Sequence, residues 1–278
     1  MILTGSARLA GVVGWPVEHS LSPRLHGYWL EHYGIDGAYV PLAVRPEAFA
    51  RALRGLADLG FQGVNVTLPH KEAALEACDE VDGPAQRIGA VNTVTLAGGR
   101  LVGSNSDAFG FMENLRQALP GWAATAAPAV VLGAGGAARA VAAALLEAGA
   151  PEIRLTNRTA ARAEALAAAL GGPLRVIPWE HRAAALEGAG LLVNATTLGM
   201  HGQAMLDIDL ARLPPGAPVT DIVYVPLETP LLAAARARGN PAVDGLGMLL
   251  HQARPGFEAW FGVRPEVTAA QRAFVLNS

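Results

Sequence analysis

Short apolar runs alternate with stretches of helical spacing along most of this chain. The strand-like runs occupy residues 9–13, 38–44, 63–68, 128–133, 152–156, 191–196 and 219–225, and amphipathic or alanine-rich stretches such as 46–60, 137–149 and 160–170 lie between them. Residues 90–107 differ, because two strand-like runs flank Gly98 and Gly99 and predict a hairpin. Strands that alternate with helices are typical of βαβ units, so the pattern predicts an α/β fold with mostly parallel sheets.

The composition is that of a globular protein and excludes several classes of partner. Hydrophobic residues make up 51% and charged residues 16% of the 278 residues, which suffices for one large or two medium domains. The net charge of −3 gives no general attraction to nucleic acid or to an anionic membrane, so we expect neither as a partner. A monomer and a homodimer both fit this composition.

The cysteine count and the first residues bear on the compartment. Cys78 is the only cysteine, so no intrachain disulfide can form, and the scattered histidines give no metal-ligand spacing. The first residues lack a basic segment followed by a long apolar one, and no run of about 18 apolar residues could span a bilayer. We therefore expect a cytoplasmic protein without a metal.

A glycine-rich turn follows the strand-like run at 128–132. It reads Gly133-Ala134-Gly135-Gly136-Ala137-Ala138 and leads into a helical stretch. This matches the G-x-G-x-x-G/A turn that lets backbone N–H groups approach a pyrophosphate at a helix N-terminus. Glycines also close ordinary strand-to-helix turns, and that alternative stays open. The strand at 152–156, about 20 residues further on, favours a dinucleotide site.

The end of that second strand indicates which dinucleotide binds. NAD sites usually have Asp or Glu here to hold the ribose 2′-hydroxyl. This chain has Asn157, Arg158 and Thr159, with Arg162 one helical turn later. Two guanidinium groups and no carboxylate suit a 2′-phosphate, so we expect NADP. The alternative is that both arginines belong to a solvated helix start.

Two segments provide groups for proton transfer. Lys71 lies just past a strand end, where the carboxyl edge of a parallel sheet forms a ligand crevice, and Asp107 follows the hairpin. A lysine and an aspartate directed at one crevice can relay a proton to or from a substrate hydroxyl. An isolated lysine is more often a solvated surface charge, so the spacing alone does not decide the role of Lys71.

Taken together, these motifs make the chain similar to shikimate dehydrogenases over essentially its full length. In order, the matching segments are Gly14 to Pro23, Asn65 to Lys71, Gly89 to Thr93, Gly103 to Gly110, the glycine-rich turn, Asn157 to Thr159, Asn194 to Met200, Asp221 to Tyr224, and Gly245 to Ala253. The resemblance implies reversible oxidation of shikimate at its 3-hydroxyl to 3-dehydroshikimate, with NADP, in the biosynthesis of aromatic amino acids.

The resemblance also implies two domains. The first, residues 1–107, would be an open, mostly parallel α/β sheet that binds substrate, with the C-terminal helices of residues 244–278 packed back onto it. The second, residues 108–243, would be a Rossmann-type NADP-binding domain, and a deep cleft would separate the two.

Site residues follow from the same resemblance. Lys71 and Asp107 would be the proton-transfer pair. The substrate would contact Ser20, Ser22, Thr67, Asn92, Asn105, Tyr224 and Gln252. NADP would contact Gly133, Ala134, Gly135, Gly136, Ala137, Asn157, Arg158, Thr159, Arg162, Thr196, Met200, Gly245 and Met248.

Ser20 and Ser22 raise a geometric question, because they lie between Pro16 and Pro23. Residues i and i+2 of an extended segment point the same way, so both hydroxyls could face the carboxylate of shikimate. The residue before a proline favours extended geometry, which supports this arrangement. The alternative is that Ser22 is only the N-cap of the following helix.

Two positions depart from the family pattern. Ser106 stands where the family usually has Thr, and His70 stands where Phe or Tyr is common. An imidazolium at His70 would lower the pKa of the neighbouring Lys71, but the sequence does not give the direction of the ring.

Two other functions remain possible. One is a quinate or dual quinate/shikimate dehydrogenase, which more often uses NAD, and the other is a non-catalytic regulator that binds NADP or shikimate.

Overall fold

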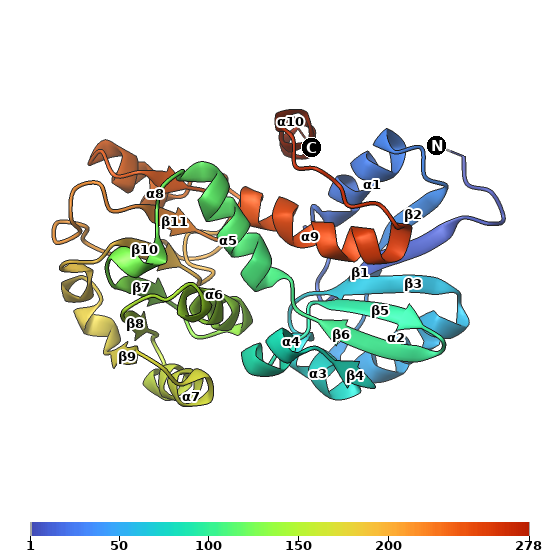
Figure 1. Ribbon diagram of the computed structural model, residues 1–278, viewed down its shortest axis with the longest axis horizontal. Helices are drawn as coiled ribbons and strands as arrows, with labels where there is room; N and C mark the ends of the chain where they lie inside the picture. The colour runs from blue at the N-terminus through green and yellow to red at the C-terminus, as the bar shows by residue number, and fades with distance from the viewer. Residues whose placement is uncertain (1, 278) are drawn as a thin grey trace. The chain divides into compact units, whose positions relative to one another are not determined.

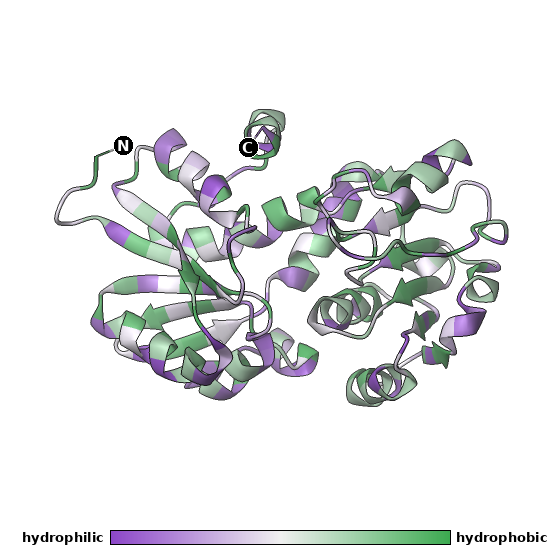
Figure 2. Cartoon of the chain, turned by 180° about the vertical axis from the view of Figure 1, so that it is seen from behind, coloured by the Kyte–Doolittle hydropathy of each residue, from purple (hydrophilic) through white to green (hydrophobic). Residues whose placement is uncertain are grey.

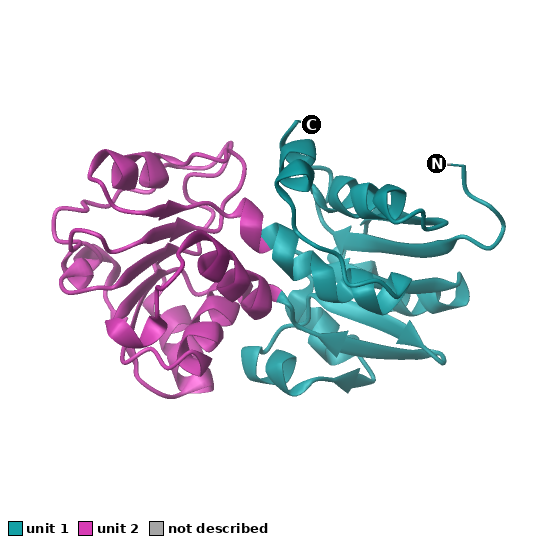
Figure 3. Cartoon of the chain, turned by 45° about the horizontal axis from the view of Figure 1, so that its top comes forward, with its two compact units in different colours: residues 1–106, 249–278 teal, residues 107–248 magenta. Residues whose placement is uncertain are grey.

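The computed structural model describes residues 2–277 and divides the chain into two compact units (Figure 3). Unit 1 comprises residues 1–106 and 249–278, and unit 2 comprises residues 107–248. This division differs from the expected one at Asp107 and at residues 244–248. Asp107 begins a helix of unit 2, Asn114 Nδ2 donates to Asp244 O at 2.8 Å, and Met248 packs in the core of that unit. The expected cleft between the domains stays a prediction.

Unit 1 is built around a six-stranded mixed sheet with the order β2-β1-β3-β5-β6-β4 (Figure 1). Its strands are β1 (Arg8–Gly14), β2 (Gly37–Ala43), β3 (Phe61–Val66), β4 (Glu80–Val81), β5 (Thr93–Ala97) and β6 (Arg100–Ser104). Its helices are α1 (Ser22–His32), α2 (Phe49–Asp58), α3 (Lys71–Ala77), α4 (Gly83–Ile88), the second part of α9 (Leu246–Phe261) and α10 (Ala269–Leu276). The pairs β1/β2, β1/β3 and β4/β6 are parallel, whereas β5 is antiparallel to both of its neighbours.

Alternation along β3 explains how helices cover both faces of this sheet. Val64 and Val66 point to one face and pack with the apolar side of α2. Gly63 lies on the other face, where Trp260 Nε1 of α9 donates to Val94 O at 3.2 Å. A side chain on Gly63 would collide with the Trp260 indole, so glycine is required for α9 to approach the sheet this closely.

Unit 2 contains a six-stranded, fully parallel sheet with the order β12-β11-β10-β7-β8-β9. Its strands are β7 (Ala129–Leu132), β8 (Ile153–Thr156), β9 (Leu174–Ile177), β10 (Leu191–Asn194), β11 (Val219–Asp221) and β12 (Ala242–Val243). Its helices are α5 (Asp107–Ala118), α6 (Gly136–Glu147), α7 (Ala160–Leu170) and α8 (Pro230–Ala237). This is the 3-2-1-4-5-6 order of dinucleotide-binding folds, whose switch point lies between β7 and β10.

The central strands of unit 2 are apolar on both faces because both faces are covered. Val131 and Val193 pack with α5 and α6, while Val130 and Leu192 pack with α8. Figure 2 shows the hydrophobic colour along these strands. Strands buried on both sides read as continuous apolar runs, which is how β7 and β10 stood out in the sequence. No helix within residues 2–277 is long and apolar enough to cross a membrane.

All seven strand-like runs and the hairpin are confirmed. Gly98 and Gly99 turn between β5 and β6 with φ of +58° and +77°, a conformation that favours glycine. The apolar pattern did not predict β4, β9 and β12, which have two to four residues and lie at the edges of their sheets. Edge strands need little apolar character, so their pattern is weak.

Candidate active site

One edge of the sheet in unit 1 collects most of the expected substrate residues. The parallel strands β1, β2 and β3 end there, with Gly14 beside Ala43 and Val13 beside Val66. Because β5 runs antiparallel to β3, it starts at this edge, and β6 ends there with Ser104 beside Thr93. The segments that leave or enter this edge contain Ser20, Ser22, Thr67, Lys71, Asn92 and Asn105. The topology therefore brings these six residues to a common edge.

The turn from β3 into α3 is tied to its neighbours by backbone hydrogen bonds. Thr67 N donates to Val13 O at 2.9 Å, and His70 N donates to Thr67 O at 3.0 Å. Lys71 is the first residue of α3 and is half-buried, and its carbonyl accepts from Val91 N at 2.9 Å. These bonds hold the backbone of Lys71 at the sheet edge.

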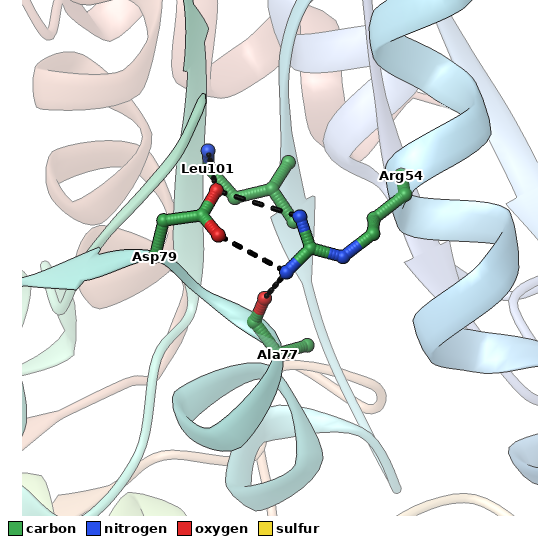
Figure 4. A network of polar contacts seen from close by, with 4 residues as sticks. All are labelled: Arg54, Ala77, Asp79 and Leu101. Atoms are coloured by element: carbon green, nitrogen blue, oxygen red, sulfur yellow. Dashed lines mark hydrogen bonds and ion pairs between the residues drawn. The ribbon is translucent and has the colours of Figure 1, made fainter. Parts of the chain in front are cut away.

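The other end of α3 is fixed by a polar network around Arg54 (Figure 4). The Arg54 Nη2 atom donates to Ala77 O at 3.2 Å and to Asp79 Oδ1 at 3.1 Å. Asp79 Oδ2 accepts from Leu101 N at 2.8 Å, and this bond, followed by the Arg54 guanidinium, lowers the pKa of Asp79. The helix that begins with Lys71 is thus held at both ends.

The direction of the His70 ring is now clear. The side chain is buried, its Nε2 lies 2.8 Å from Val44 O, and the ring stacks on Phe49 with centroids 4.5 Å apart. A carbonyl oxygen only accepts, so Nε2 carries a proton and donates. The imidazole therefore fills an aromatic core position, as Phe or Tyr would, and adds one hydrogen bond next to Lys71.

Asn92 joins the two strand ends of the hairpin. Its Oδ1 accepts from Ser106 N at 2.9 Å and from Thr93 Oγ1 at 2.9 Å, and its Nδ2 donates to Ser106 Oγ at 3.1 Å. Asn105 Nδ2 donates to Ala90 O at 2.9 Å. All of these side chains are buried, so the two asparagines are presented at the sheet edge in defined orientations. The hydroxyl of Ser106 is used here, where the family usually has the hydroxyl of Thr.

The expected geometry of Ser20 and Ser22 was wrong. Leu21 between them is helical, with φ of −81° and ψ of −5°, and α1 already begins at Ser22, so the segment is not extended. The alternative that Ser22 caps the helix is also wrong, because the position before the helix is occupied by Leu21 and no side chain caps it there. Ser20 Oγ instead accepts from Ser22 N at 3.3 Å.

The glycine-rich turn of unit 2 has the geometry that a phosphate site needs. Gly133 has a φ of +112°, and a Cβ there would lie 2.9 Å from Ala195 O of the neighbouring strand end. A Cβ on Gly135 would point into open space, so the backbone is accessible on that side. No side chain within the described residues caps α6, which leaves the N-terminal N–H groups of a twelve-residue helix for an anion. These residues fit a dinucleotide pyrophosphate.

The end of β8 presents positive charge. Asn157 Nδ2 donates to Thr159 O at 2.9 Å and shapes the turn that precedes α7. Arg158 and Arg162 are exposed, and residues 157–163 contain no Asp or Glu. The arrangement fits an additional phosphate group better than a free ribose hydroxyl.

A buried carboxylate, which was not among the expected site residues, connects the ends of β10 and β11. Asp221 Oδ1 accepts from Asn194 Nδ2 and Val223 N, both at 3.0 Å, and Asp221 Oδ2 accepts from Thr229 Oγ1 at 2.8 Å. Asn194 Oδ1 in turn accepts from Thr196 Oγ1 at 2.7 Å. Asn194 and Asp221 are the last residues of their strands, and a polar residue directly after a short apolar stretch was the available signal.

The remaining expected site residues are distributed over both units. Tyr224 follows this network in unit 2, where burial raises the pKa of its phenol. Met200 is exposed, and Gly245 and Met248 are buried in unit 2 near the start of α9. Gln252 is half-buried on the part of α9 that belongs to unit 1. Their contacts with ligands, and the pairing of Lys71 with Asp107, stay predictions.

Comparison with known proteins gives consistent matches along the chain. Residues 12–94 match the family model of the shikimate dehydrogenase substrate binding domain, residues 116–201 that of shikimate / quinate 5-dehydrogenase, and residues 245–273 that of the shikimate 5′-dehydrogenase C-terminal domain. The shikimate dehydrogenase (NADP(+)) of Paramagnetospirillum magneticum is 64% identical over 276 residues, which cover 99% of this chain and 100% of that protein.

Two solved structures are similar over nearly their whole length. One is shikimate 5-dehydrogenase from Thermus thermophilus in complex with NADP(H) and shikimate, with a TM-score of 0.87, 42% identity, and coverage of 97% of this chain and 99% of that one. The other is quinate dehydrogenase from Corynebacterium glutamicum in complex with NAD, with a TM-score of 0.90, 31% identity, and coverage of 98% and 99%.

The buried Asp221 should make stability depend on pH. Burial raises the pKa of Asp221 in the folded state, although the hydrogen bonds from Val223, Thr229 and Asn194 oppose this rise. An Asp in the unfolded chain has a pKa of about 3.9. At a pH between the unfolded and the folded pKa of Asp221, the folded state therefore binds more protons than the unfolded state. The free energy of unfolding is highest below the unfolded pKa and falls as pH rises through the folded pKa. In urea titrations from pH 4 to pH 7, wild type should lose stability relative to Asp221→Asn.

The variant Thr229→Val provides a second comparison for Asp221. It removes one donor to the carboxylate, so the pKa should rise further and the loss of stability should extend to higher pH. Parallel stability profiles for wild type and Asp221→Asn would contradict the assignment.

Proposed function

This chain belongs to the shikimate dehydrogenase family, and we propose that it catalyses the NADP-dependent, reversible oxidation of shikimate to 3-dehydroshikimate. In the biosynthetic direction the reaction reduces 3-dehydroshikimate on the route to chorismate and the aromatic amino acids. Family membership supports the reaction, and the geometry of the sheet edge in unit 1 supports the roles of individual residues.

The observation that carries the proposal is the identity of the residue at position 71. The chain has 21 cationic residues of the Lys and Arg type, and Lys71 is the only lysine among them. Arginine remains protonated at any physiological pH, whereas a lysine amine can release and accept a proton. The single lysine thus lies at the first position of α3, on the sheet edge that also carries most of the residues proposed to bind substrate. Proton transfer explains why arginine does not replace it.

The chain's own residues would handle the proton and hold the ligands. When bound, NADP takes the hydride from the carbon that bears the 3-hydroxyl or returns it. Lys71 and Asp107 form the proton-transfer pair at the oxygen of that hydroxyl, so no alkoxide charge is left unneutralised. Asp107 follows Ser106, whose position Asn92 fixes.

Neutral donors and acceptors suit the hydroxyl groups of shikimate. Thr67, Asn92, Asn105 and Gln252 would bind these hydroxyls, and Ser20, Ser22 and Tyr224 would bind the carboxylate end. Hydroxyl donors hold the carboxylate without placing a full positive charge beside the reacting centre.

The residues of unit 2 would bind NADP. The turn from Gly133 to Ala137 would hold the pyrophosphate, and Asn157, Arg158, Thr159 and Arg162 the 2′-phosphate. Thr196, Met200, Gly245 and Met248 would contact the rest of the dinucleotide. The left-handed Gly133 and the accessible backbone of Gly135 support this assignment.

Two other functions are separated by one assay. A quinate or dual-specificity dehydrogenase is the nearer one, since a quinate dehydrogenase with NAD has the same fold. A regulator that binds the ligands without turnover is the other. Absorbance at 340 nm, with shikimate or quinate and NADP or NAD, distinguishes the three, and we expect strong turnover only with shikimate and NADP.

The setting of the enzyme is also a proposal. The single cysteine and the small net charge support a cytoplasmic enzyme whose partners are its small-molecule ligands. It would act as a monomer or a homodimer, which light scattering on a sizing column can decide.

Replacement of Lys71 tests the proton-transfer role. Lys71→Ala should lower kcat by about 10²–10⁴, the usual range for one proton-transfer group. Lys71→Arg keeps the charge but cannot give up a proton, so it should lose a similar factor while KM for shikimate changes little. The matched control is Arg51→Ala, an exposed cation on α2, which should behave as wild type. Turnover of Lys71→Arg within threefold of wild type would refute the role.

Reversal of charge at Arg158 tests cofactor choice. One charge-assisted bond contributes about 1.5–3 kcal/mol, or roughly a 10- to 150-fold preference for NADP over NAD in kcat/KM. Arg158→Asp should remove most of that preference, whereas Arg51→Asp should not. Equal use of both cofactors by the unmutated enzyme would contradict the assignment.

Removal of the serine hydroxyls tests the carboxylate site. A bond to a charged group is worth about 1.5–3 kcal/mol, so Ser20→Ala and Ser22→Ala should each raise KM for shikimate roughly tenfold or more. KM for NADP should not change. Lower melting temperatures with an unchanged KM for shikimate in both variants would mean that the serines only support the turn.

A further inference from the structure

The buried carboxylate of Asp221 holds segments of unit 2 that carry proposed ligand contacts, although Asp221 is not itself one of those contacts. It is the last residue of β11 and is fully buried. Its Oδ1 atom accepts two hydrogen bonds at 3.0 Å, one from Asn194 Nδ2 and one from Val223 N. A single oxygen atom thus binds both the end of β10 and the segment that follows β11.

The bond to Asn194 leads to the turn that contains Thr196. Asn194 Oδ1 accepts from Thr196 N at 3.1 Å and from Thr196 Oγ1 at 2.7 Å, and Asn194 Nδ2 also donates to Leu198 O at 3.0 Å. Thr196 Oγ1 in turn accepts from Leu198 N at 3.0 Å. The Thr196 hydroxyl is therefore used inside the turn as donor and as acceptor. The turn leads on to Met200, so its shape sets the position of two proposed NADP contacts.

The bond to Val223 holds the segment that leads to Tyr224, which would bind the carboxylate end of shikimate. Gly245 packs directly on this segment, because a Cβ on Gly245 would collide with Ile222 O and Val223 O. The start of α9, where further NADP contacts are proposed, therefore rests on backbone that Asp221 holds.

The other oxygen of the carboxylate binds a segment without a proposed ligand contact. Asp221 Oδ2 accepts from Thr229 Oγ1 at 2.8 Å, and Thr229 caps α8 by accepting from Leu232 N at 3.4 Å. None of the residues proposed to contact NADP or shikimate lies on α8. The two oxygens thus hold different parts of the unit, and variants can remove their bonds separately.

We propose that Asp221 is a positioning residue for both ligands. Its Oδ1 atom fixes the Thr196 turn relative to the Tyr224 segment, and this sets the spacing between groups that would contact NADP and a group that would contact shikimate. A carboxylate suits the position because it offers acceptors on both oxygens and no competing donor. The identity of the two ligands rests on the proposed function.

The test compares KM values of three variants at a temperature well below their unfolding midpoints. Asp221→Leu removes both acceptors at similar size, so KM for NADP and KM for shikimate should each rise roughly tenfold or more, as for loss of a bond to a charged group. Asp221→Asn keeps one acceptor oxygen for Asn194 and Val223, so both KM values should stay within about threefold of wild type.

Thr229→Val is the matched control. It removes the bond to Oδ2 and the cap of α8, so its unfolding midpoint should fall while both KM values stay unchanged. A variant that only destabilises the fold lowers the fraction of active enzyme and therefore the apparent kcat. The molecules that remain folded keep the wild-type KM, so KM separates positioning from general support of the fold.

Three results would overturn the proposal. They are unchanged KM values in Asp221→Leu, a rise in Thr229→Val as large as that in Asp221→Leu, and a rise in Asp221→Asn as large as that in Asp221→Leu. If Asp221→Leu does not fold, Asn194→Asp takes its place.

The variant Asn194→Asp keeps the oxygen that binds Thr196 but replaces the donor to Asp221 with an oxygen. KM for NADP should then rise roughly tenfold, and an unchanged KM for NADP would overturn the proposal. Absence of shikimate turnover in wild type would instead refute the proposed function.

Discussion

The amide of Asn92 makes the contacts on which the proposed substrate edge of unit 1 depends. It joins the start of β5 to the segment after β6 through Thr93 and Ser106. The contact is buried, and a buried polar group without a partner costs about 1–3 kcal/mol, so the amide and its partners fix one another. Asn105 lies in the same segment, directly before Ser106. One side chain therefore holds the segment that contains Asn105, a second residue proposed to bind substrate.

In both units, parallel strands end at one edge of the sheet and bring the segments that follow them together. In unit 2 every strand is parallel, and the ends of β7 and β10 flank the switch point where the glycine-rich turn begins. In unit 1 the antiparallel β5 brings an entering segment to the edge at which β1 and β3 end. This explains why residues from before and after strands can contribute to one site. It also explains the position of Lys71, since the helix after β3 starts at that edge.

Local patterns were sufficient to predict much of the fold. The hairpin at Gly98 and Gly99 and the turn at Gly133 depend on backbone conformations that glycine favours, so neighbouring residues suffice to identify them. The geometry of Ser20 and Ser22 could not be predicted from Pro23, because a proline in the first turn of α1 is compatible with helical geometry at Leu21 and Ser22. The prediction assumed that the extended preference before proline would decide.

Contacts between distant segments were beyond a reading of the sequence. Tyr39 and Asn65 lie 26 positions apart, and Asp221 binds Asn194 across 27 positions. In the sequence alone, each of these four residues looks like an ordinary strand residue, because the pairing of the strands is not known. One informative signal was overlooked, namely that Lys71 is the only lysine of the chain. Arginine occupies all of the remaining Lys or Arg positions of the chain, so the lysine at position 71 points to a role that needs an amine able to release a proton.

A crystal structure of the enzyme with shikimate bound tests the proposed substrate site most clearly. We expect the shikimate carboxylate to contact the Ser20 and Ser22 hydroxyls and the 3-hydroxyl to lie within hydrogen-bonding distance of Lys71 Nζ. A substrate bound in the reverse direction, with its carboxylate at Lys71, or a substrate bound away from this sheet edge would contradict the proposed roles of these residues.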